Sequence, residues 1–308
     1  MMEATYLVTG SMGCVGAWVL HHLVKQGKRA ISFDLSTDRA RLNALLTPDE
    51  QHAITFINGE AGDLTQFERV KLAFEQHNIT HVVHLAALQV PFCRANPVLG
   101  AQVNVTGTVN VFEAAKQSDV RHLALASSVA VYGAATAYPP GLLAHDAPML
   151  PATLYGVYKV ANEGTARIYW QDHSLSSTTL RPYTVYGVGR DLGMTSEPTK
   201  AMVAAAHGLD YHITFGGHMQ FHFASDVALQ FIAAAEQAHD GALAFNLGTP
   251  PVDVIDVAAL IIAAAPGVKI TVGDGRLPFP AGCDPSAFYA HAQTIYETPL
   301  ADGVRQTI

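Results

Sequence analysis

Where an apolar run gives way to a helical pattern, the chain reads Thr9-Gly10-Ser11-Met12-Gly13-Cys14-Val15-Gly16. The apolar run at residues 4–9 predicts a buried strand, and residues 14–26 carry apolar side chains at helical spacing. Glycines between a strand and a helix let backbone N–H groups approach a pyrophosphate, which the helix N-terminus also favours. A purely steric glycine turn is the alternative, because the spacing is GxxGxxG rather than GxGxxG. The stretch therefore predicts a dinucleotide site, made by Gly10, Met12, Gly13, Cys14, Val15 and Gly16.

Downstream of this turn, strand-like and helix-like runs alternate. Helices are predicted at residues 98–116 and 155–170, and strands at residues 29–34, 54–58, 81–86, 123–127 and 177–181. Thr65 and Glu68 have the pattern of a capping box and predict another helix start. Strict alternation is typical of the α/β class, with a doubly wound parallel sheet of the Rossmann type and helices on both faces. Ligands bind such sheets at the carboxyl ends of the strands.

After Pro182 the pattern becomes irregular, with glycines and prolines in clusters. Helices are still predicted at residues 199–207, 224–236 and 254–264, and strands at residues 212–215, 219–223 and 243–247. We therefore expect two lobes. Residues 1–182 form the dinucleotide-binding domain, to which the chain returns at about 220–248, and residues 183–308 form a smaller substrate-binding lobe.

The composition is that of a globular enzyme. Of the 308 residues, 49% are apolar and 14% are charged, with a formal net charge of -8 and no cluster of Lys and Arg. This balance argues against a nucleic acid or an anionic membrane as partner. The longest apolar run, residues 257–266, is too short for a bilayer, which needs about 20 residues. Residues 1–9 lack the pattern of a secretory signal, so we expect a cytoplasmic protein.

Cysteines and histidines indicate neither a disulfide framework nor a metal site. Cys14, Cys93 and Cys283 form no CxxC pair, and their number is odd. His218 and His222 lie four residues apart, but no third ligand accompanies them. We therefore expect no metal and a reducing compartment.

Two carboxylates follow predicted strands. Asp34 ends the second strand, near the position about 20 residues downstream where an acidic side chain binds the ribose hydroxyls of a dinucleotide. A carboxylate there repels a 2′-phosphate and favours NAD, while Arg39 and Arg41 nearby keep NADP as an alternative. Asp63 and Leu64 follow the third strand. Asp63 either accepts from the adenine amino group or helps to cap the next helix, and the sequence favours neither.

A tyrosine and a lysine four residues apart point to proton transfer. On a helix Tyr155 and Lys159 share a face, so the ammonium lies beside the phenol oxygen. A free tyrosine has a pKa near ~10, and a nearby positive charge lowers it until the phenol takes a proton from an alcohol. Ser128 ends the fifth strand, where its hydroxyl is placed to bond the reacting oxygen. A surface Tyr/Lys pair and an ordinary strand-end serine are the alternatives.

The motifs come in a fixed order, namely the glycine turn, Asp34, His84-Leu85-Ala86-Ala87, Asn104, Ser128, Tyr155, Lys159 and Arg181-Pro182. This set resembles the extended short-chain dehydrogenase/reductase family, in its NAD-dependent epimerase/dehydratase group, over about the first two-thirds of the chain. The resemblance implies NAD as cofactor and Tyr155 as acid/base, with Ser128 orienting the substrate oxygen. Lys159 would hold the nicotinamide ribose and lower the tyrosine pKa. Further implied cofactor residues are Leu85, Ala86 and Ala87 along the cleft, Asn104 as support, and Pro182 and Tyr183 near the nicotinamide. Family members usually pair through two helices, so the resemblance also implies a homodimer through residues 98–116 and 155–170.

Departures from the family pattern concern the substrate. Dehydratases of the family look like Ser-Thr-Asp-Glu-Val-Tyr-Gly after the fifth strand. This chain reads Ser127-Ser128-Val129-Ala130-Val131-Tyr132-Gly133 there and lacks the acid and base for water elimination. Members that bind nucleotide diphosphate sugars usually carry Asn where Thr184 stands and Arg where Gln220 stands. Because Gln220 supplies no charge to a diphosphate, we expect a compact substrate without one.

The predicted substrate residues are Gln89, Ser128, Tyr155, Thr184 and Arg190. Arg190 either reaches a substrate carboxylate or hydroxyl, or is a solvated loop arginine. The main hypothesis is an NAD-dependent oxidoreductase that takes hydride from a secondary alcohol of a compact sugar, sugar acid or lactone. The alternative is a sugar or nucleotide-sugar epimerase that retains NAD and works through a keto intermediate. A third hypothesis, a nucleotide-sensing or scaffold protein without turnover, is disfavoured by the presence of both Tyr155 and Lys159.

Overall fold

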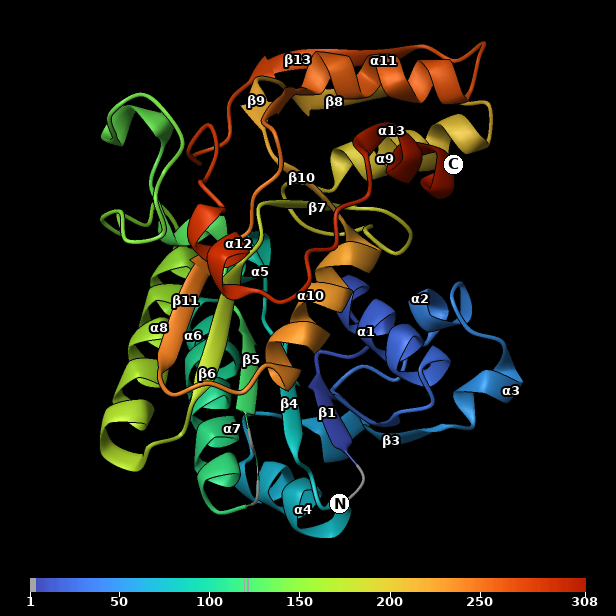
Figure 1. The fold of residues 1–308 in the computed structure, drawn as a ribbon. Helices are drawn as coiled ribbons and strands as arrows, with labels where there is room; N and C mark the ends of the chain where they lie inside the picture. The colour runs from blue at the N-terminus through green and yellow to red at the C-terminus, as the bar shows by residue number, and fades with distance from the viewer. Residues whose placement is uncertain (1–3, 119, 121) are drawn as a thin grey trace.

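The computed structural model describes residues 4–118, 120 and 122–308. Within these residues the larger lobe is built on a parallel sheet of seven strands in the order β11-β6-β5-β4-β1-β2-β3 (Figure 1). The strands are β1 (Thr5–Thr9), β2 (Arg29–Asp34), β3 (Ile54–Asn58), β4 (His81–His84), β5 (His122–Ala126), β6 (Ser177–Arg181) and β11 (Ala242–Asn246). After β3 the chain crosses back, so that β4 pairs with β1. This order confirms the predicted doubly wound α/β fold.

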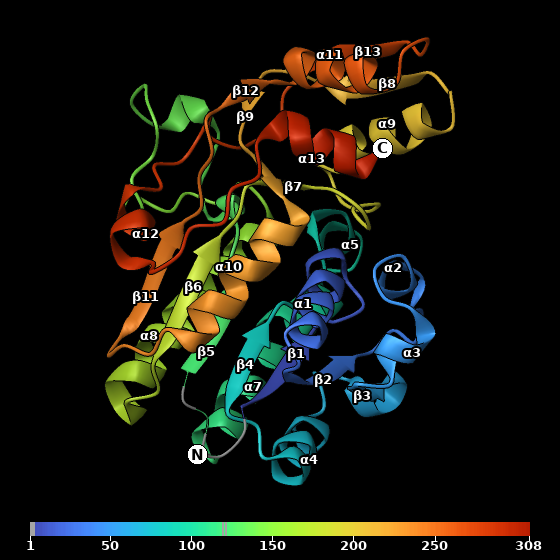
Figure 2. The ribbon, with the colours of Figure 1, turned by 45° about the vertical axis from the view of Figure 1, so that its right-hand side comes forward.

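Helices cover both faces of the sheet (Figure 2). One face carries α1 (Cys14–Lys25) and α10 (Ala224–Glu236), and the other carries α4 (Phe67–His77), α7 (Gly107–Lys116) and α8 (Leu154–His173). Successive side chains of a strand point to opposite faces, so a covered sheet needs apolar residues in a row. In β1, Leu7 belongs to the core on one face and Val8 to the core on the other, and both are fully buried.

The smaller lobe lies beyond the carboxyl ends of the strands, at the top of Figure 1. It contains α9 (Glu197–Ala206), β8 (Tyr211–Phe215), α11 (Val254–Ala264), β13 (Ile270–Gly275) and α13 (Leu300–Thr307). β8 and β13 pair in parallel. α13 packs closely through Gly303, where an added Cβ would fall 2.0 Å from the Tyr186 hydroxyl oxygen.

Two short strand pairs lie between the lobes. β7 (Thr184–Tyr186) pairs in parallel with β10 (Phe221–Phe223), and β9 (His218–Met219) pairs antiparallel with β12 (Val252–Asp253). The chain then returns to the larger lobe, where Phe231 of α10 is buried and Phe245 of β11 lies opposite Leu180 of β6. We propose that the dinucleotide-binding lobe comprises residues 1–182 with about 220–248, and that the rest of 183–308 forms the substrate lobe.

Three local predictions differ from the structure. The capping box is wrong, because α4 begins at Phe67 and the Thr65 hydroxyl donates to Asp63 instead. The predicted helix at 98–116 consists of α6 (Pro97–Ala101), a π-helical turn (Gln102–Thr106) and α7. The predicted strand at 219–223 is interrupted at Gln220, whose side chain bonds the backbone of Cys283.

Several elements that the sequence did not indicate are short. They are α2 (Ala40–Asn43), α3 (Pro48–Gln51), α5 (Val90–Ala95), α12 (Ser286–His291) and the 3-10 turns Gly59–Gly62, Val129–Val131 and Ala135–Ala137. Runs this short carry too few residues for a hydrophobic period to stand out. No helix in the described part of the chain is long and apolar enough to cross a bilayer.

Candidate active site

A cavity of about 380 Å³ opens at the carboxyl ends of the central strands. Among the residues that line it are Gly10, Met12, Gly13, Cys14, Val15, Gly16, Asp34, Asp63, Leu64, Leu85, Ala86, Ala87, Tyr155, Lys159 and Pro182, all predicted for the cofactor. Gln89 and Arg190, predicted for the substrate, line it as well. The structure thus brings segments far apart in the sequence to one cleft.

Two glycines of the turn leave no room for a side chain. Gly10 has a φ of +66°, and an added Cβ would fall 2.6 Å from the Ala86 nitrogen. A Cβ on Gly16 would fall 2.2 Å from the Gly10 oxygen. The turn is therefore pressed against the end of β4, with the N-terminus of α1 directly behind it. This cradle fits the pyrophosphate of a dinucleotide.

The Asp34 carboxylate is held by backbone donors at the edge of the cleft. It accepts from the Met12 and Ser36 N–H groups, each at 2.8 Å. Burial raises the pKa of Asp34, and these N–H groups act against that rise. Both nearby arginines have other partners: Arg39 stacks 3.6 Å above the Phe56 ring, and Arg41 pairs with Asp191. This arrangement suits an unphosphorylated ribose.

Asp63 bonds the turn before α4, and the adenine contact that the sequence left open stays a prediction. Its Oδ1 accepts from the backbone N–H of Thr65 at 2.9 Å and from the Thr65 hydroxyl at 2.8 Å. The residue also lines the cleft beside Leu64. Stabilising the turn before α4 therefore does not remove Asp63 from the cofactor site.

Asn104 supports the cleft from behind without lining it. On the π-helical turn, its amide accepts from the Leu88 N–H at 2.7 Å and donates to the Leu88 oxygen at 2.9 Å.

His84 bridges Thr9, at 2.7 Å, and Thr108, at 3.0 Å. Because the Thr108 hydroxyl donates to the Asn104 oxygen, His84 donates to Thr108 through Nε2. Burial lowers the pKa of His84 to about 3.

Tyr155 and Lys159 project from the first turns of α8, which Thr153 caps by accepting from the Gly156 N–H at 3.1 Å. The Lys159 ammonium donates to the Ala126 oxygen at 2.6 Å and lies 5.5 Å from the centre of the Tyr155 ring. Burial lowers the pKa of Lys159 to about 8. The lysine is therefore anchored to the end of β5 rather than to the phenol.

Burial raises the pKa of Tyr155 to about 12, against a hydrogen bond with Ser128 and the charge of Arg190, which both lower it. The sequence predicted that Lys159 lowers the tyrosine pKa, whereas the pKa of Tyr155 is raised, and Ser128 and Arg190 only oppose that rise. The reason is geometric, since the Lys159 Nζ turns to a backbone carbonyl. Ser128 also accepts from the Ala130 N–H at 3.1 Å, which fixes its hydroxyl beside the tyrosine.

A second chamber of about 140 Å³ adjoins the cleft at Tyr155. Gln89, Ser127, Tyr155, Pro182 and Arg190 line both spaces, whereas Ser128, Tyr183, Thr195 and Phe279 line only the chamber. Tyr183 donates to the Pro280 oxygen at 2.6 Å, so its ring forms part of the wall. The chamber is smaller than the roughly 300–1,000 Å³ typical of pockets for drug-sized ligands.

Thr184 and Gln220 do not reach the chamber. Thr184, predicted as a substrate residue, is fully buried, and its hydroxyl donates to the Met219 sulfur at 3.3 Å. Gln220 donates to the Thr249 and Cys283 oxygens, at 2.7 and 2.8 Å. Both side chains hold the junction between the lobes, because the chain turns inward after β6. The prediction that Thr184 contacts the substrate is therefore not supported.

A loop of the smaller lobe crosses the glycine turn, a feature that the sequence did not reveal. The Trp18 indole donates to the Val188 oxygen at 3.1 Å. Arg41 donates to the Gly189 oxygen at 3.1 Å and to the Met12 oxygen at 2.9 Å, and its Nη2 lies 2.7 Å from Asp191. We call residues 187–191 the strap, because these bonds fasten them over the cofactor cleft.

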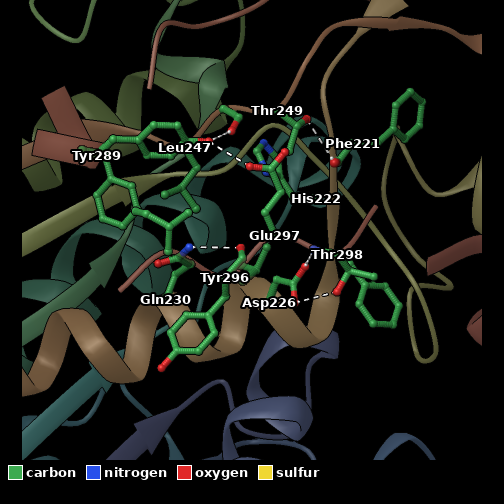
Figure 3. A pocket seen from close by; sticks show the side chains of 15 residues that line it. Phe221, His222, Asp226, Gln230, Leu247, Thr249, Tyr289, Tyr296, Glu297 and Thr298 are labelled. Atoms are coloured by element: carbon green, nitrogen blue, oxygen red, sulfur yellow. Dashed lines mark hydrogen bonds between the residues drawn. The ribbon is translucent and has the colours of Figure 1, made fainter. Parts of the chain in front are cut away.

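A further cavity, of about 30 Å³, lies where the C-terminal segment crosses α10 (Figure 3). Gln230 donates to the Tyr296 oxygen at 3.2 Å, and Asp226 accepts from the Thr298 hydroxyl at 3.0 Å. A space of this size suits a water molecule rather than a substrate. Among the described residues, no group of three or more His, Cys, Asp or Glu is arranged to hold a metal ion.

Comparison with known proteins identifies the family of the chain. Residues 6–248 match the family model described as the NAD dependent epimerase/dehydratase family. The UDP-glucose 4-epimerase of Mycolicibacterium smegmatis is 30% identical over 79% of this chain and 76% of its own length. UDP-glucuronate 4-epimerase 2 of Arabidopsis thaliana is 35% identical over 59% of this chain, but the match spans only 42% of that protein.

A solved structure shows the same relationship. The UDP-glucose 4-epimerase of Thermus thermophilus in complex with NAD superposes with a TM-score of 0.81 at 26% identity, covering 98% of this chain and 97% of that one. With the glycine cradle, the Asp34 carboxylate and the Tyr155–Lys159 pair in one cleft, the chain belongs to the NAD-dependent epimerase/dehydratase family of extended short-chain dehydrogenases/reductases and is an NAD-dependent enzyme.

Proposed function

We propose that this chain is an epimerase that retains NAD and inverts a secondary alcohol of a compact sugar-like substrate through a keto intermediate. The observation that carries the proposal is the position of Tyr155, which lines both the cleft that fits NAD and the adjoining chamber. The names of its relatives, UDP-glucose and UDP-glucuronate 4-epimerases, support epimerisation rather than net oxidation.

The residues of the chamber have separate tasks. Tyr155 accepts the hydroxyl proton only as the phenolate, while Ser128 holds the same oxygen. Because burial raises the pKa of Tyr155 to about 12, the phenolate needs the support of the Ser128 hydrogen bond and of positive charge in the cleft. The glycine turn, Asp34 and Lys159 would hold NAD, which would supply reversible hydride chemistry beside Tyr155. Arg190 adds a positive charge that lowers the pKa of Tyr155. Val129 and Ala130 line the chamber and offer neither acid nor base, so elimination of water is not part of the proposal.

The strap supports retention of the cofactor. Val188 accepts from Trp18 of α1, and Gly189 accepts from Arg41, which also donates to Met12 of the glycine turn. In this proposal these bonds slow the release of a dinucleotide from the cleft. An epimerase needs no exchange of cofactor between turnovers, whereas a dehydrogenase must exchange it each time.

Net dehydrogenation of the same class of substrate is the second candidate. An epimerase must hold one end of the substrate while the keto group presents its other face. In this chain Gln220 is tied to Thr249 and Cys283 and is not free to hold a diphosphate. A compact substrate has no diphosphate by which the protein could hold it, so its ketone would be released more readily after oxidation.

A single experiment separates these candidates. The purified protein is analysed for bound NAD and then incubated with sugars, aldonates, uronates, lactones and nucleotide sugars. We expect NAD to copurify and an inverted product to form without accumulation of NADH. One NADH per ketone released would instead establish the dehydrogenase, and activity confined to nucleotide sugars would overturn the compact substrate. No turnover of any compound would contradict both candidates.

We also propose that the chain forms a homodimer. Leu154, Val157 and Ile168 are exposed on one face of α8, next to exposed Val98 and Leu99 of α6. Exposed apolar side chains gathered on adjoining helices are typical of an interface. Light scattering should give the mass of a dimer, and Val157→Glu should give that of a monomer. If the unsubstituted protein is a monomer, this proposal is wrong.

The cytoplasmic location remains a prediction.

A further inference from the structure

Arg190 enters the substrate chamber as a cation that the protein itself does not neutralise. Its Nη2 donates to the Thr195 hydroxyl at 3.1 Å, and its Nε is buried without a hydrogen-bond partner among the described residues. Its acidic neighbour Asp191 already accepts from Arg41 Nε and Nη2, at 3.1 and 2.7 Å. The solvated loop arginine, which the sequence left open, is therefore excluded.

The rest of the chamber wall provides no compensating charge. Among the described residues that line it, Arg190 alone is charged, and Val90, Val129, Met194 and Phe279 are apolar. The Arg190 side chain is partly buried, and a cation withdrawn from water is costly unless it is paired, so a bound anion that meets the guanidinium would complete the site. The planar fork of arginine matches a carboxylate, with which it forms two parallel charge-assisted hydrogen bonds.

Gln89 supplies a second unsatisfied group on the same wall. Its Oε1 is buried without a donor in the described structure. Gly193 closes over this amide, since a Cβ there would fall 2.1 Å from Gln89 Oε1 and 3.1 Å from Arg190 Nη2. The loop therefore brings a free acceptor and a free cation together. A substrate with hydroxyl groups near an acid group satisfies both.

We propose that Arg190, positioned by Thr195 and flanked by Gln89, binds the carboxylate of the substrate, which is therefore a polyhydroxy acid of the aldonate type. This inference rests on the proposed function, because it uses the same chamber and places the reacting alcohol at Tyr155. Arg190 also faces the cofactor cleft, so the pyrophosphate of NAD is the competing anion. Thr195 and Met194 line only the substrate side, which favours the substrate carboxylate.

The test measures binding rather than turnover. Calorimetry on the NAD-loaded protein compares xylonate and gluconate with xylitol and sorbitol, which carry the same hydroxyl chains without the acid. We expect at least one acid to bind ten-fold or more tightly than its alditol. Arg190→Met should remove that difference, and Arg190→Lys should restore part of it. Thr195→Val should weaken the acid several-fold, whereas Arg276→Met, at an exposed position of the smaller lobe, should change nothing.

Three results would overturn the inference. The first is equal binding of every acid and its alditol by the unsubstituted protein. The second is an Arg190→Met variant that weakens NAD as strongly as the acid, which assigns the arginine to the pyrophosphate. The third is an Arg190→Met variant that binds NAD and the acid as before. If the acid binds in a way that depends on Arg190 but no compound is turned over, this inference stands and the proposed function is refuted. If neutral sugars are turned over at a rate that does not depend on Arg190, the proposed function stands and this inference is refuted.

Discussion

The Glu163 carboxylate of α8 accepts from both ends of the Arg181 guanidinium, Nε at 2.8 Å and Nη2 at 2.5 Å, where β6 ends. Their side chains are only 6% and 2% exposed. Ser127 at the end of β5 donates to the same carboxylate at 2.5 Å. This pair therefore fastens the helix that carries Tyr155 and Lys159 to the strand ends around the active site.

Glu163→Gln should destabilise the protein strongly. The substitution leaves a buried guanidinium without its counter-charge, and removal of one partner of a buried pair costs about 3–5 kcal/mol. Denaturant unfolding of the NAD-free protein measures the loss. Glu75→Gln is the matched control, because Glu75 pairs with Lys71 at 3.7 Å on an exposed helix face and should lose at most about 1 kcal/mol. Similar losses in both variants would contradict the assignment.

Tyr155→Phe should abolish turnover while the cofactor still binds. Loss of a positioned acid/base lowers the rate by roughly 10²–10⁴-fold. Ring packing is unchanged, so the dissociation constant of NAD should stay within a factor of about three, or under 1 kcal/mol. Rates come from the substrate panel and affinities from fluorescence titration. A variant that keeps its activity would show that another group moves the proton.

Trp18→Phe should speed the release of NAD. The substitution removes the hydrogen bond from the indole to the Val188 oxygen, which is worth about 0.5–1.5 kcal/mol, so dissociation should rise roughly 2–10-fold. Chase experiments with excess NAD analogue measure the rate. Arg39→Gln is the control, because Arg39 stacks on the Phe56 ring. An unchanged rate in Trp18→Phe would mean that the strap does not gate the cofactor.

Mild acid should destabilise the fold through three buried histidines. Burial lowers the pKa of His84 and His122 to about 3 and that of His222 to about 4, from an ordinary value of 6.5. Below pH 6.5 these histidines bind protons in the unfolded chain but stay unprotonated in the folded chain. The free energy of unfolding therefore falls as pH falls. Each group contributes up to about 1.4 kcal/mol per pH unit.

Thermal unfolding between pH 7 and pH 5 checks this expectation. The melting temperature should decrease steadily, and His222→Asn should reduce the slope, since it removes one of the histidines whose pKa burial lowers. His52→Asn, at an exposed position, should leave the slope unchanged. A melting temperature that stays constant over this range would contradict the argument.

Local sequence patterns predicted the part of the site that depends on the backbone. The glycines of the turn and the strand-end Asp34 follow from short-range geometry, and so does the shared helix face of Tyr155 and Lys159. The partner of Lys159 was missed, because the Ala126 carbonyl is a backbone group that carries no sequence signal. The position of Arg190 at the wall of the chamber was also not predictable, since it depends on how the strap folds back over α1. The substrate contact predicted for Thr184 also depended on the tertiary structure. The chain turns inward at β7, so the Thr184 hydroxyl is buried against the Met219 sulfur.

The return of the chain through α10 to β11 has a consequence for how such enzymes acquire new substrates. β11 occupies the outer edge next to β6, and α10 shields the face that α1 leaves open. A gene fragment that stopped at residue 182 would encode an unpaired strand edge and a bare apolar surface, which invite aggregation. A single crossover at residue 182 would therefore exchange α10 and β11 together with the specificity lobe. Exchange of the lobe alone needs junctions on both sides of the returning segment.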